Sequence, residues 1–261
     1  MELLGTLTII GYILSTLSIK YVLIEEEYNF YKKISFDVIF FLSLLLFSIY
    51  AYSLISDVYQ KFNFITSLEI TFLIVNYLFF LFMFTKPIKH LGLVLLPLTA
   101  IAVLASMMYQ DNTDLGFIDP GLRIHIIVSI ASYGFLALGA IQAILLRYQE
   151  KKLKDVTDSL FLTILPSIEK MEQVMFDLII FGFILLTLSL LSGAPFVSMD
   201  KDPGLLEKIL FSIIAWITYS YLIYSRFSKG VRGRKATSFT LSGMAFLLTA
   251  YLGTKLFFEL Y

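Results

Sequence analysis

The chain has 261 residues, of which 58% are hydrophobic, 16% aromatic and only 15% charged. A soluble domain carries many more charged side chains on its surface, so this composition indicates an integral membrane protein. The absence of cysteine excludes disulfides, thiolate metal sites and cysteine nucleophiles, and the formal net charge of zero gives no reason to expect a nucleic-acid partner.

Eight apolar segments are long enough to cross a bilayer, because a spanning helix needs about 20 mostly apolar residues. Lipid cannot satisfy the backbone polar groups of an open strand, so each segment is expected to be a helix. The sequence therefore predicts an all-α, polytopic membrane protein in which residues 1–261 form a single integral membrane domain. The predicted segments are 3–23, 37–56, 66–85, 91–109, 124–146, 173–193, 205–225 and 238–258.

The distribution of Lys and Arg predicts how the chain is oriented in the membrane. Most of these residues lie in the loops that join segments 1 and 2, 3 and 4, 5 and 6, and 7 and 8. Because basic loops stay in the cytoplasm, both termini are predicted to lie on the non-cytoplasmic side. The first segment follows Glu2 instead of a basic stretch and precedes no small-residue cleavage site, so we expect it to be retained.

Three loops have sequences that predict local structure. Two loops on the predicted external side end in Asp-Pro-Gly, at 119–121 and 202–204. Pro presets its own φ and Gly tolerates a positive φ, so each tripeptide is expected to form a turn that starts the next helix. On the cytoplasmic side, residues 148–172 mix basic and apolar side chains around Pro166, which is typical of an amphipathic segment on the membrane surface.

His125 is one of two histidines and lies at the start of the fifth segment, on the predicted external side. It can serve as a metal or haem ligand, or it can be an interfacial residue whose ring bonds a loop carbonyl. Arg123 is two residues away and Lys201 lies in the neighbouring external loop. A ligand with carboxylates, such as haem, would find cationic partners in these two side chains.

A second haem ligand is harder to identify. His90 lies at the cytoplasmic end of the fourth segment, so a hydrocarbon core about 30 Å thick separates it from His125. Methionine can also bind haem iron. Met107, Met108 and Met199 all fall on the external side, although a methionine near a membrane interface also serves as an ordinary packing residue.

Several polar residues have both a functional and a structural interpretation. Asp177 is the acid most expected inside the hydrocarbon, unless the sixth helix begins a turn later and leaves it at the interface. Asn76, in the middle of the third segment, is expected to hydrogen-bond another helix. Glu169 and Glu172 would share one helix face near a helix N-terminus, where acids favour the dipole and Ser167 would be the cap.

Three stretches of the chain, 124–154, 165–193 and 216–256, resemble the cytochrome c assembly protein family. Within it they look most like the small bacterial inner-membrane branch called YpjD or HemX-like, and the resemblance is strongest over 120–258. It implies a multi-pass inner-membrane protein that handles haem at the external face, as relatives of the CcsA and CcmC type do. Membrane lipids and proteins of haem maturation or haem synthesis would be its partners.

The resemblance also implies a ligand and shows what is missing around it. In such relatives an external histidine opens the helix before a basic cytoplasmic loop, and His125 resembles that residue. Their tryptophan-rich external motif has no counterpart here, because the loop 192–209 lacks tryptophan and the single Trp216 falls in the seventh segment. No histidine follows His125, so haem binding by two histidines is excluded within one chain. Transient haem binding, or an accessory role in cytochrome c maturation, is the expected function.

Two other functions stay open. A transporter would use a polar path that includes Asp177, Asn76 and helix-breaking glycines such as Gly182. A membrane scaffold or regulator of haem synthesis would use basic cytoplasmic residues of the 226–235 loop to hold a soluble partner. No Walker loop, zinc signature or serine-nucleophile motif is present, so enzymatic activity is not expected.

Overall fold

The structure is a computed structural model, and it describes residues 2–24, 30–56, 64–108, 120–154, 165–197 and 204–253. Over these residues the secondary structure is entirely helical, which confirms the predicted all-α class. The helices form two compact units, one made mainly of residues 1–118 and the other mainly of residues 119–157 and 167–261. Each unit is described by itself, and the single membrane domain expected over 1–261 stays a prediction.

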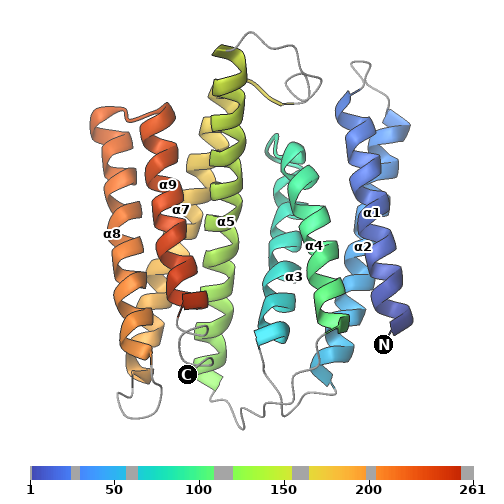
Figure 1. Cartoon of the computed structure of the whole chain (residues 1–261), viewed down its shortest axis with the longest axis horizontal. Coiled ribbons are helices and arrows are strands. Elements are labelled where there is room, and N and C mark those ends of the chain that lie inside the picture. The colour runs from blue at the N-terminus through green and yellow to red at the C-terminus, as the bar shows by residue number, and fades with distance from the viewer. Residues whose placement is uncertain are drawn as a thin grey trace. The chain divides into compact units, whose positions relative to one another are not determined.

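The first unit is a four-helix bundle, coloured blue to green in Figure 1. Helix α1 contacts α2 and α4, and α3 contacts the same two helices, so the four helices close a ring around one core. A short 3-10 turn, η1, leads into α4. The elements are α1 (Glu2–Ile24), α2 (Phe30–Ser56), α3 (Phe64–Phe82), η1 (Lys89–Leu91) and α4 (Gly92–Met108).

Aromatic rings fill the middle of this bundle. The Tyr12 ring on α1 meets Phe40 and Phe47 of α2 edge-on, with centroids 6.3 and 5.7 Å apart. Phe40 also meets Phe79 of α3 at 5.6 Å. Such edge-to-face pairs add to the free energy gained from burial alone. Because lipid gives no hydrophobic driving force between helices, this close packing is what holds the bundle together.

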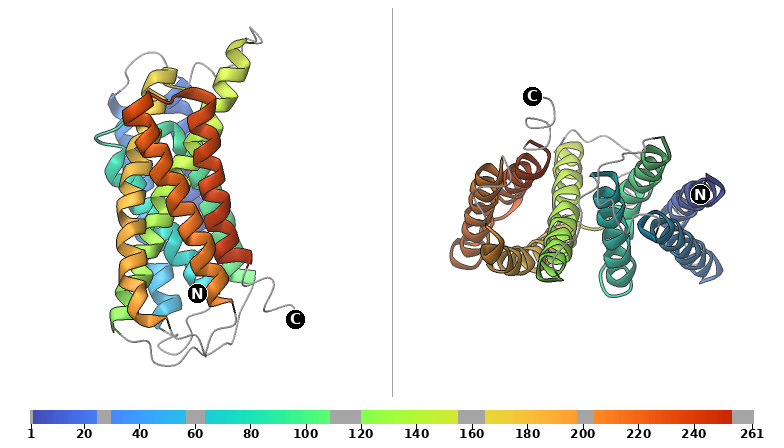
Figure 2. Two further views of the ribbon diagram at one scale, coloured as in Figure 1. Left: turned by 90° about the vertical axis from the view of Figure 1, so that its left-hand side faces the viewer. Right: turned by 90° about the horizontal axis from the view of Figure 1, so that it is seen from below.

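The second unit is also a closed ring of four helices (Figure 1). Helix α7 contacts α5 and α8, and α9 contacts the same two helices, an arrangement seen end-on in Figure 2. A π-helical segment continues α9. The elements are α5 (Pro120–Lys154), α7 (Ile168–Gly193), η2 (Ala194–Phe196), α8 (Leu205–Lys229), α9 (Gly233–Leu248) and η3 (Thr249–Gly253).

The α5–α7 pair is held by glycine contacts and by hydrogen bonds between the helices. At Gly182 on α7 an added Cβ would lie 2.7 Å from a methyl carbon of Leu136, so only glycine allows this approach. The carbonyl of Gly182 accepts a hydrogen bond of 2.9 Å from the Ser132 hydroxyl. Further along, the Gln142 amide donates to the carbonyl of Met171 at 3.0 Å. Close approach of this kind is how small residues join helices in a membrane.

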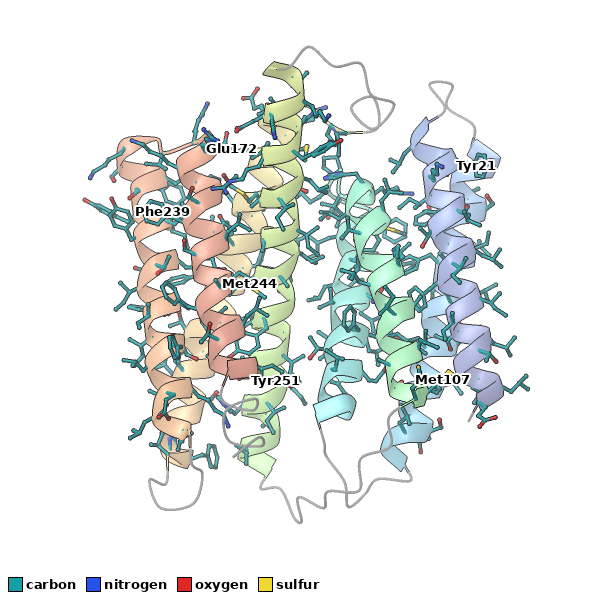
Figure 3. All side chains as sticks on the ribbon, viewed as in Figure 1. Tyr21, Met107, Glu172, Phe239, Met244 and Tyr251 are labelled. Carbon is teal, nitrogen blue, oxygen red and sulfur yellow. The ribbon has the colours of Figure 1, made fainter. Side chains whose placement is uncertain are left out.

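Six helices of the described residues are long and apolar enough to cross a membrane. They are α1, α2, α5, α7 and α8, together with the continuous stretch Lys89–Met108, while α3 and α9 are shorter. Figure 3 shows apolar side chains standing outward along the helices, where a bilayer would contact them. The chain is therefore a multi-pass membrane protein; the predicted total of eight spans and the side of the termini stay predictions.

Several helix boundaries differ from those predicted, at both N-terminal and C-terminal ends. Helix α5 begins at Pro120 instead of residue 124, with Pro as its first residue, while Asp119 of the predicted turn lies outside the described residues. Helix α7 begins at Ile168, five residues earlier than predicted, with Ser167 as its N-cap residue but without a side-chain cap bond. Of the predicted amphipathic segment 148–172, residues 155–164 lie outside the described residues. Its first part continues α5 to Lys154, and its last part contains the start of α7.

Candidate functional site

His125 lies in the second turn of α5, and its half-buried ring faces the last turn of α7. Its Nδ1 atom lies 3.0 Å from the carbonyl oxygen of Ser189 and 3.2 Å from the hydroxyl oxygen of Ser192. The Ser192 hydroxyl donates to the same Ser189 carbonyl at 3.0 Å. Two polar groups therefore meet at Nδ1, and both belong to α7.

This arrangement decides which ring nitrogen of a neutral His125 carries the proton. A carbonyl oxygen can only accept, so the bond to Ser189 requires the proton to be on Nδ1. The lone pair of the neutral imidazole is then on Nε2, for which the described residues provide no hydrogen-bond partner. Metal-bound histidines are typically held in this way, since a bond from one nitrogen to a backbone carbonyl orients the other toward the metal.

Two small residues of α7 let the His125 ring approach that helix. An added Cβ at Gly193 would lie 2.6 Å from Cε1 and 3.0 Å from Nδ1 of His125, so the ring rests directly on the glycine. Below it, the Ser129 hydroxyl lies 2.5 Å from the Ser189 hydroxyl and donates to the carbonyl of His125 itself. The orientation of the ring is therefore fixed by α7 as much as by its own helix.

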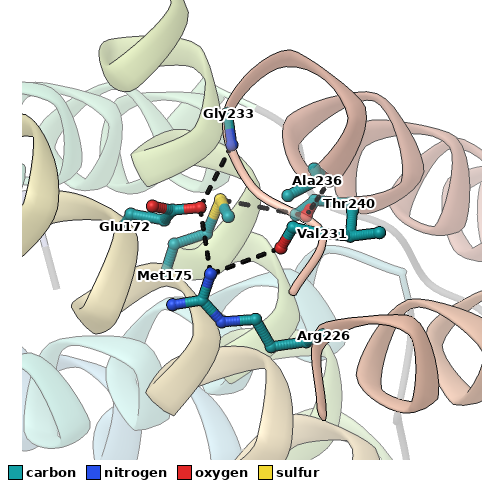
Figure 4. Close-up of polar contacts among 7 residues, drawn as sticks. All are labelled: Glu172, Met175, Arg226, Val231, Gly233, Ala236 and Thr240. Atoms are coloured by element: carbon teal, nitrogen blue, oxygen red, sulfur yellow. Dashed lines mark hydrogen bonds and ion pairs between the residues drawn. The ribbon is translucent and has the colours of Figure 1, made fainter. Parts of the chain in front are cut away.

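At the opposite end of α7, an ion pair joins three helices of the same unit (Figure 4). The nearly buried Glu172 accepts from the Arg226 guanidinium at 3.4 Å and from the backbone N–H of Gly233 at 3.1 Å. Arg226 also donates to the carbonyl of Val231 at 3.3 Å and lies over the Phe176 ring, 4.5 Å from its centroid. Glu172 is thus committed to a structural contact at the α8–α9 turn.

Comparison with known proteins identifies the family. Residues 33–260 match the family described as Cytochrome C assembly protein. The chain belongs to this family. Its resemblance to cytochrome c assembly proteins is therefore confirmed over most of its length.

Two relatives show how similar this chain is in sequence to known proteins. The inner membrane protein YpjD of Escherichia coli strain K12 is 29% identical over 173 residues, which cover 64% of this chain and 65% of that protein. The cytochrome c biogenesis protein CcsA of Prochlorococcus marinus strain MIT 9303 is 30% identical over 94 residues, covering 34% and 28%. The match to YpjD thus spans less than two thirds of that relative.

The other predicted ligands of this assembly-family protein are only partly described. Lys201 and Met199 lie outside the described residues, and Arg123 lies on α5 without a described side chain. Met107 and Met108 are the last two residues of α4, in the other unit (Figure 3). The Met107 sulfur packs against Gly5 and would lie 2.5 Å from a Cβ added to that glycine. Met108 is 80% exposed. The grouping of these residues with His125 stays a prediction.

Three polar or aromatic residues singled out in the sequence are built into helix contacts. The amide of Asn76 donates to the Thr99 hydroxyl of α4 at 2.8 Å, which confirms the predicted bond between helices. Trp216 lies within α8, donates to the Thr187 hydroxyl at 2.9 Å and stacks on Phe183. The half-buried Asp177 is the tenth residue of α7, so the early start of this helix places it in the third turn.

Gly182 does not break its helix, contrary to the polar-path interpretation. It lies inside the continuous α7 and is packed against Leu136 of α5. No group of three or more His, Cys, Asp or Glu side chains that could hold a metal ion occurs within the described residues. Among the described residues of this unit, a metal or haem site would therefore depend on the single imidazole of His125.

One buried acid was not found by sequence reasoning. Glu69 of α3 is 1% exposed, and neither carboxylate oxygen has a hydrogen-bond partner among the described residues. The available signal was the position of this acid in the stretch TSLEITFL, inside the predicted third segment. Glu69 belongs to the first unit and therefore forms no part of the His125 site.

Proposed function

We propose that this protein binds haem transiently through Nε2 of His125 at the external face of the bacterial inner membrane, as a presenting or accessory factor in cytochrome c maturation. The observation that carries the proposal is the hydrogen bond from Nδ1 of His125 to the Ser189 carbonyl. It leaves the Nε2 lone pair of the neutral ring available as an axial ligand, a role that histidine commonly takes with haem iron. Family membership and the CcsA relatives, named for cytochrome c biogenesis, support the same function.

The surroundings of His125 fit a haem held by one protein ligand. Gly193 has no Cβ to crowd Nε2, since a Cβ added there would lie 3.2 Å from that atom. In this proposal Arg123 and Lys201 pair with the propionates, because guanidinium and ammonium groups bind carboxylates well. When bound, haem carries the iron chemistry, while the chain contributes binding and orientation.

The same surroundings explain why the proposed binding is transient. The chain has two histidines, and the second, His90, is buried in the other unit at 2% exposure. The only tryptophan is engaged between α7 and α8. A methionine, Met199, Met107 or Met108, would have to complete the iron coordination, and a thioether is a weaker partner than a second imidazole.

The test is an absorbance titration of the detergent-purified full chain with haem, in oxidised and reduced forms. We expect a Soret band that His125→Ala abolishes, while His90→Gln, a change at the only other histidine, keeps it. Added imidazole should restore the band in His125→Gly, because it replaces the lost ligand without refolding the protein. An unchanged spectrum in His125→Ala, with the fold intact by circular dichroism, would remove His125 from the proposed function.

A further inference from the structure

Glu69 lies in the α1–α4 bundle and has no part in the proposed haem site. It lies six residues into α3 and is 1% exposed, with both carboxylate oxygens unpartnered among the described residues. An ionised carboxylate without a partner is costly to bury, and such a group is expected to gain a proton or a counter-ion instead. Intramembrane acids of this kind often mark a functional site.

Few neighbouring hydroxyl groups can donate a hydrogen bond to Glu69. Ser106 of α4 lies beside the carboxyl, but its hydroxyl donates to the Val103 carbonyl at 2.8 Å. The Tyr50 hydroxyl, 2.9 Å from Ser106, must therefore donate its own proton to that serine oxygen. Tyr12 of α1 is also near Glu69, and its buried hydroxyl has no partner among the described residues. Among the described neighbours, the Tyr12 hydroxyl is the one whose proton is not already used in a hydrogen bond.

No described basic side chain forms an ion pair with Glu69. The titratable groups that face it are the phenols of Tyr12 from α1 and Tyr50 from α2, while α4 contributes Ser106. Tyr77, on α3 itself, is near Tyr12 and pairs with the Ser48 hydroxyl at 2.7 Å. Among the described residues the surroundings are therefore neutral and offer no positive charge to an ionised Glu69.

We propose that Glu69 is a proton-binding site inside the α1–α4 bundle. In the protonated form the carboxylic acid carries its own hydrogen beside the Ser106 hydroxyl, and no uncompensated charge is left inside the bundle. In the ionised form, two carboxylate oxygens compete for one phenolic proton. The proposal stands independently of haem binding at His125, which belongs to the other unit.

The position of the cluster favours a proton over a larger occupant. Ser106 is two residues before the end of α4 at Met108, and Glu69 is five residues after the start of α3 at Phe64. At 1.5 Å per residue, the two side chains lie about 3 to 8 Å inside the bundle end. That end is tightly closed, since an added Cβ at Gly5 would lie 2.5 Å from the Met107 sulfur and 3.1 Å from the Tyr50 ring. A proton needs only a short relay of hydroxyls to reach water from here.

The deciding measurement is an infrared difference spectrum between the wild-type full chain and Glu69→Gln, recorded at neutral pH and titrated upward. We expect a C=O stretch of a protonated carboxylic acid that shifts in D2O, is absent from Glu69→Gln and disappears as the pH rises. Glu207→Gln, a change at an exposed acid in the first turn of α8, is the matched control and should remove only carboxylate bands.

Two outcomes would overturn the proposal. Carboxylate bands for Glu69 at neutral pH that change when Na⁺ or K⁺ is added would show that a metal cation occupies the site instead of a proton. Carboxylate bands that respond to neither pH nor cations would show an ionised structural acid. Thermal melting in detergent provides a second readout: Glu69→Gln, which mimics the neutral acid, should melt within a few degrees of wild type, and a large loss in Glu69→Gln would contradict a neutral Glu69.

Discussion

Nδ1 of His125 on α5 lies 3.0 Å from the carbonyl oxygen of Ser189 on α7, and the ring rests on Gly193 one turn further along that helix. The imidazole is thus oriented by an interhelical contact and not by its own helix alone. A carbonyl acceptor cannot be removed by a side-chain change, so the bond persists whichever residue occupies position 189. Any movement of α7 relative to α5 would instead change where Nε2 points.

The first prediction concerns Gly193. In Gly193→Ala the new Cβ would lie 2.6 Å from Cε1 of His125, so the ring must move or the helices must separate. Because groups that orient a metal-ligating histidine typically change affinity by about 10- to 100-fold, we expect haem affinity to fall by about 10-fold or more. A haem titration followed in the Soret region measures this.

A glycine elsewhere on the same helix pair provides the control for this change. An added Cβ at Gly139 of α5 would meet Ile179 at 3.3 Å, far from His125 along the helix. Gly139→Ala should therefore lower stability slightly and leave haem affinity unchanged. Equal losses of haem affinity in both variants would mean that general loosening of the α5–α7 pair, and not displacement of the imidazole, is responsible.

The second prediction concerns the ion pair between Glu172 and Arg226. Removing one member of a buried pair leaves the other charge uncompensated, which costs about 3 kcal/mol or more. Arg226 keeps 23% of its side-chain surface exposed, so water offsets part of the cost and we expect a smaller loss, about 2 kcal/mol, in Glu172→Ala. Reversible unfolding in mixed detergent gives the free energy of unfolding.

Glu169 on the same helix is the matched acid, because it is exposed at the first turn of α7. Glu169→Ala should change the free energy of unfolding by less than about 0.5 kcal/mol, as surface substitutions usually do. The double variant Glu172→Ala/Arg226→Ala should lose less than the sum of the two single variants. Strict additivity would show that the pair contributes no coupling energy.

The sequence allowed the helical architecture to be predicted, since runs of apolar residues of spanning length force the backbone to bond within each helix. It also placed His125 at the start of a helix and Trp216 inside one. Helix starts were predicted too late, because apolar content marks the stretch in lipid and not the polar first turns. Both α5 and α7 extend beyond the apolar stretch in this way.

The contacts of the candidate site could not be predicted, because they depend on which faces of distant helices meet. Ser189 and Gly193 are unremarkable residues in an apolar helix until α5 brings His125 against them. In the same way Asp177 attracted attention by its position in the sequence, whereas among the described residues the buried acid without a hydrogen-bond partner is Glu69 on α3. Burial and hydrogen bonding of an acid are properties of the bundle, which no single segment encodes.

The third prediction tests the packing at Gly182. Its replacement by Ala would place a Cβ 2.7 Å from Leu136, and overpacking of this kind costs about 1 to 3 kcal/mol. Leu136→Ala alone should also destabilise, because it leaves a cavity. The double variant should be more stable than the sum of the two losses predicts, since the new methyl group fills part of that cavity; unfolding in mixed detergent measures all three. A double variant worse than the sum would contradict direct contact between the two positions.

The fourth prediction concerns the side of the membrane on which His125 lies. The chain has no cysteine, so a single introduced thiol reports one position only. Val197, 38% exposed just after the end of α7, and Arg232, exposed between α8 and α9, lie at opposite ends of the 25-residue α8, about 37 Å apart along its axis. The excess of basic residues in the 226–235 loop predicts that Arg232 is cytoplasmic. In intact cells, a membrane-impermeant maleimide should therefore label Val197→Cys, and Arg232→Cys only after permeabilisation.

The labelling pattern also bears on haem binding, because His125 contacts Gly193 and so lies at the same end of its unit as Val197. If Val197→Cys reacts from outside, Nε2 of His125 is at the face where the proposal requires haem to be presented. The reverse pattern would place His125 at the cytoplasmic face, and the proposed external presentation of haem would be wrong even if the Soret band depended on this residue. Labelling of both thiols before permeabilisation would instead show that α8 does not cross the membrane.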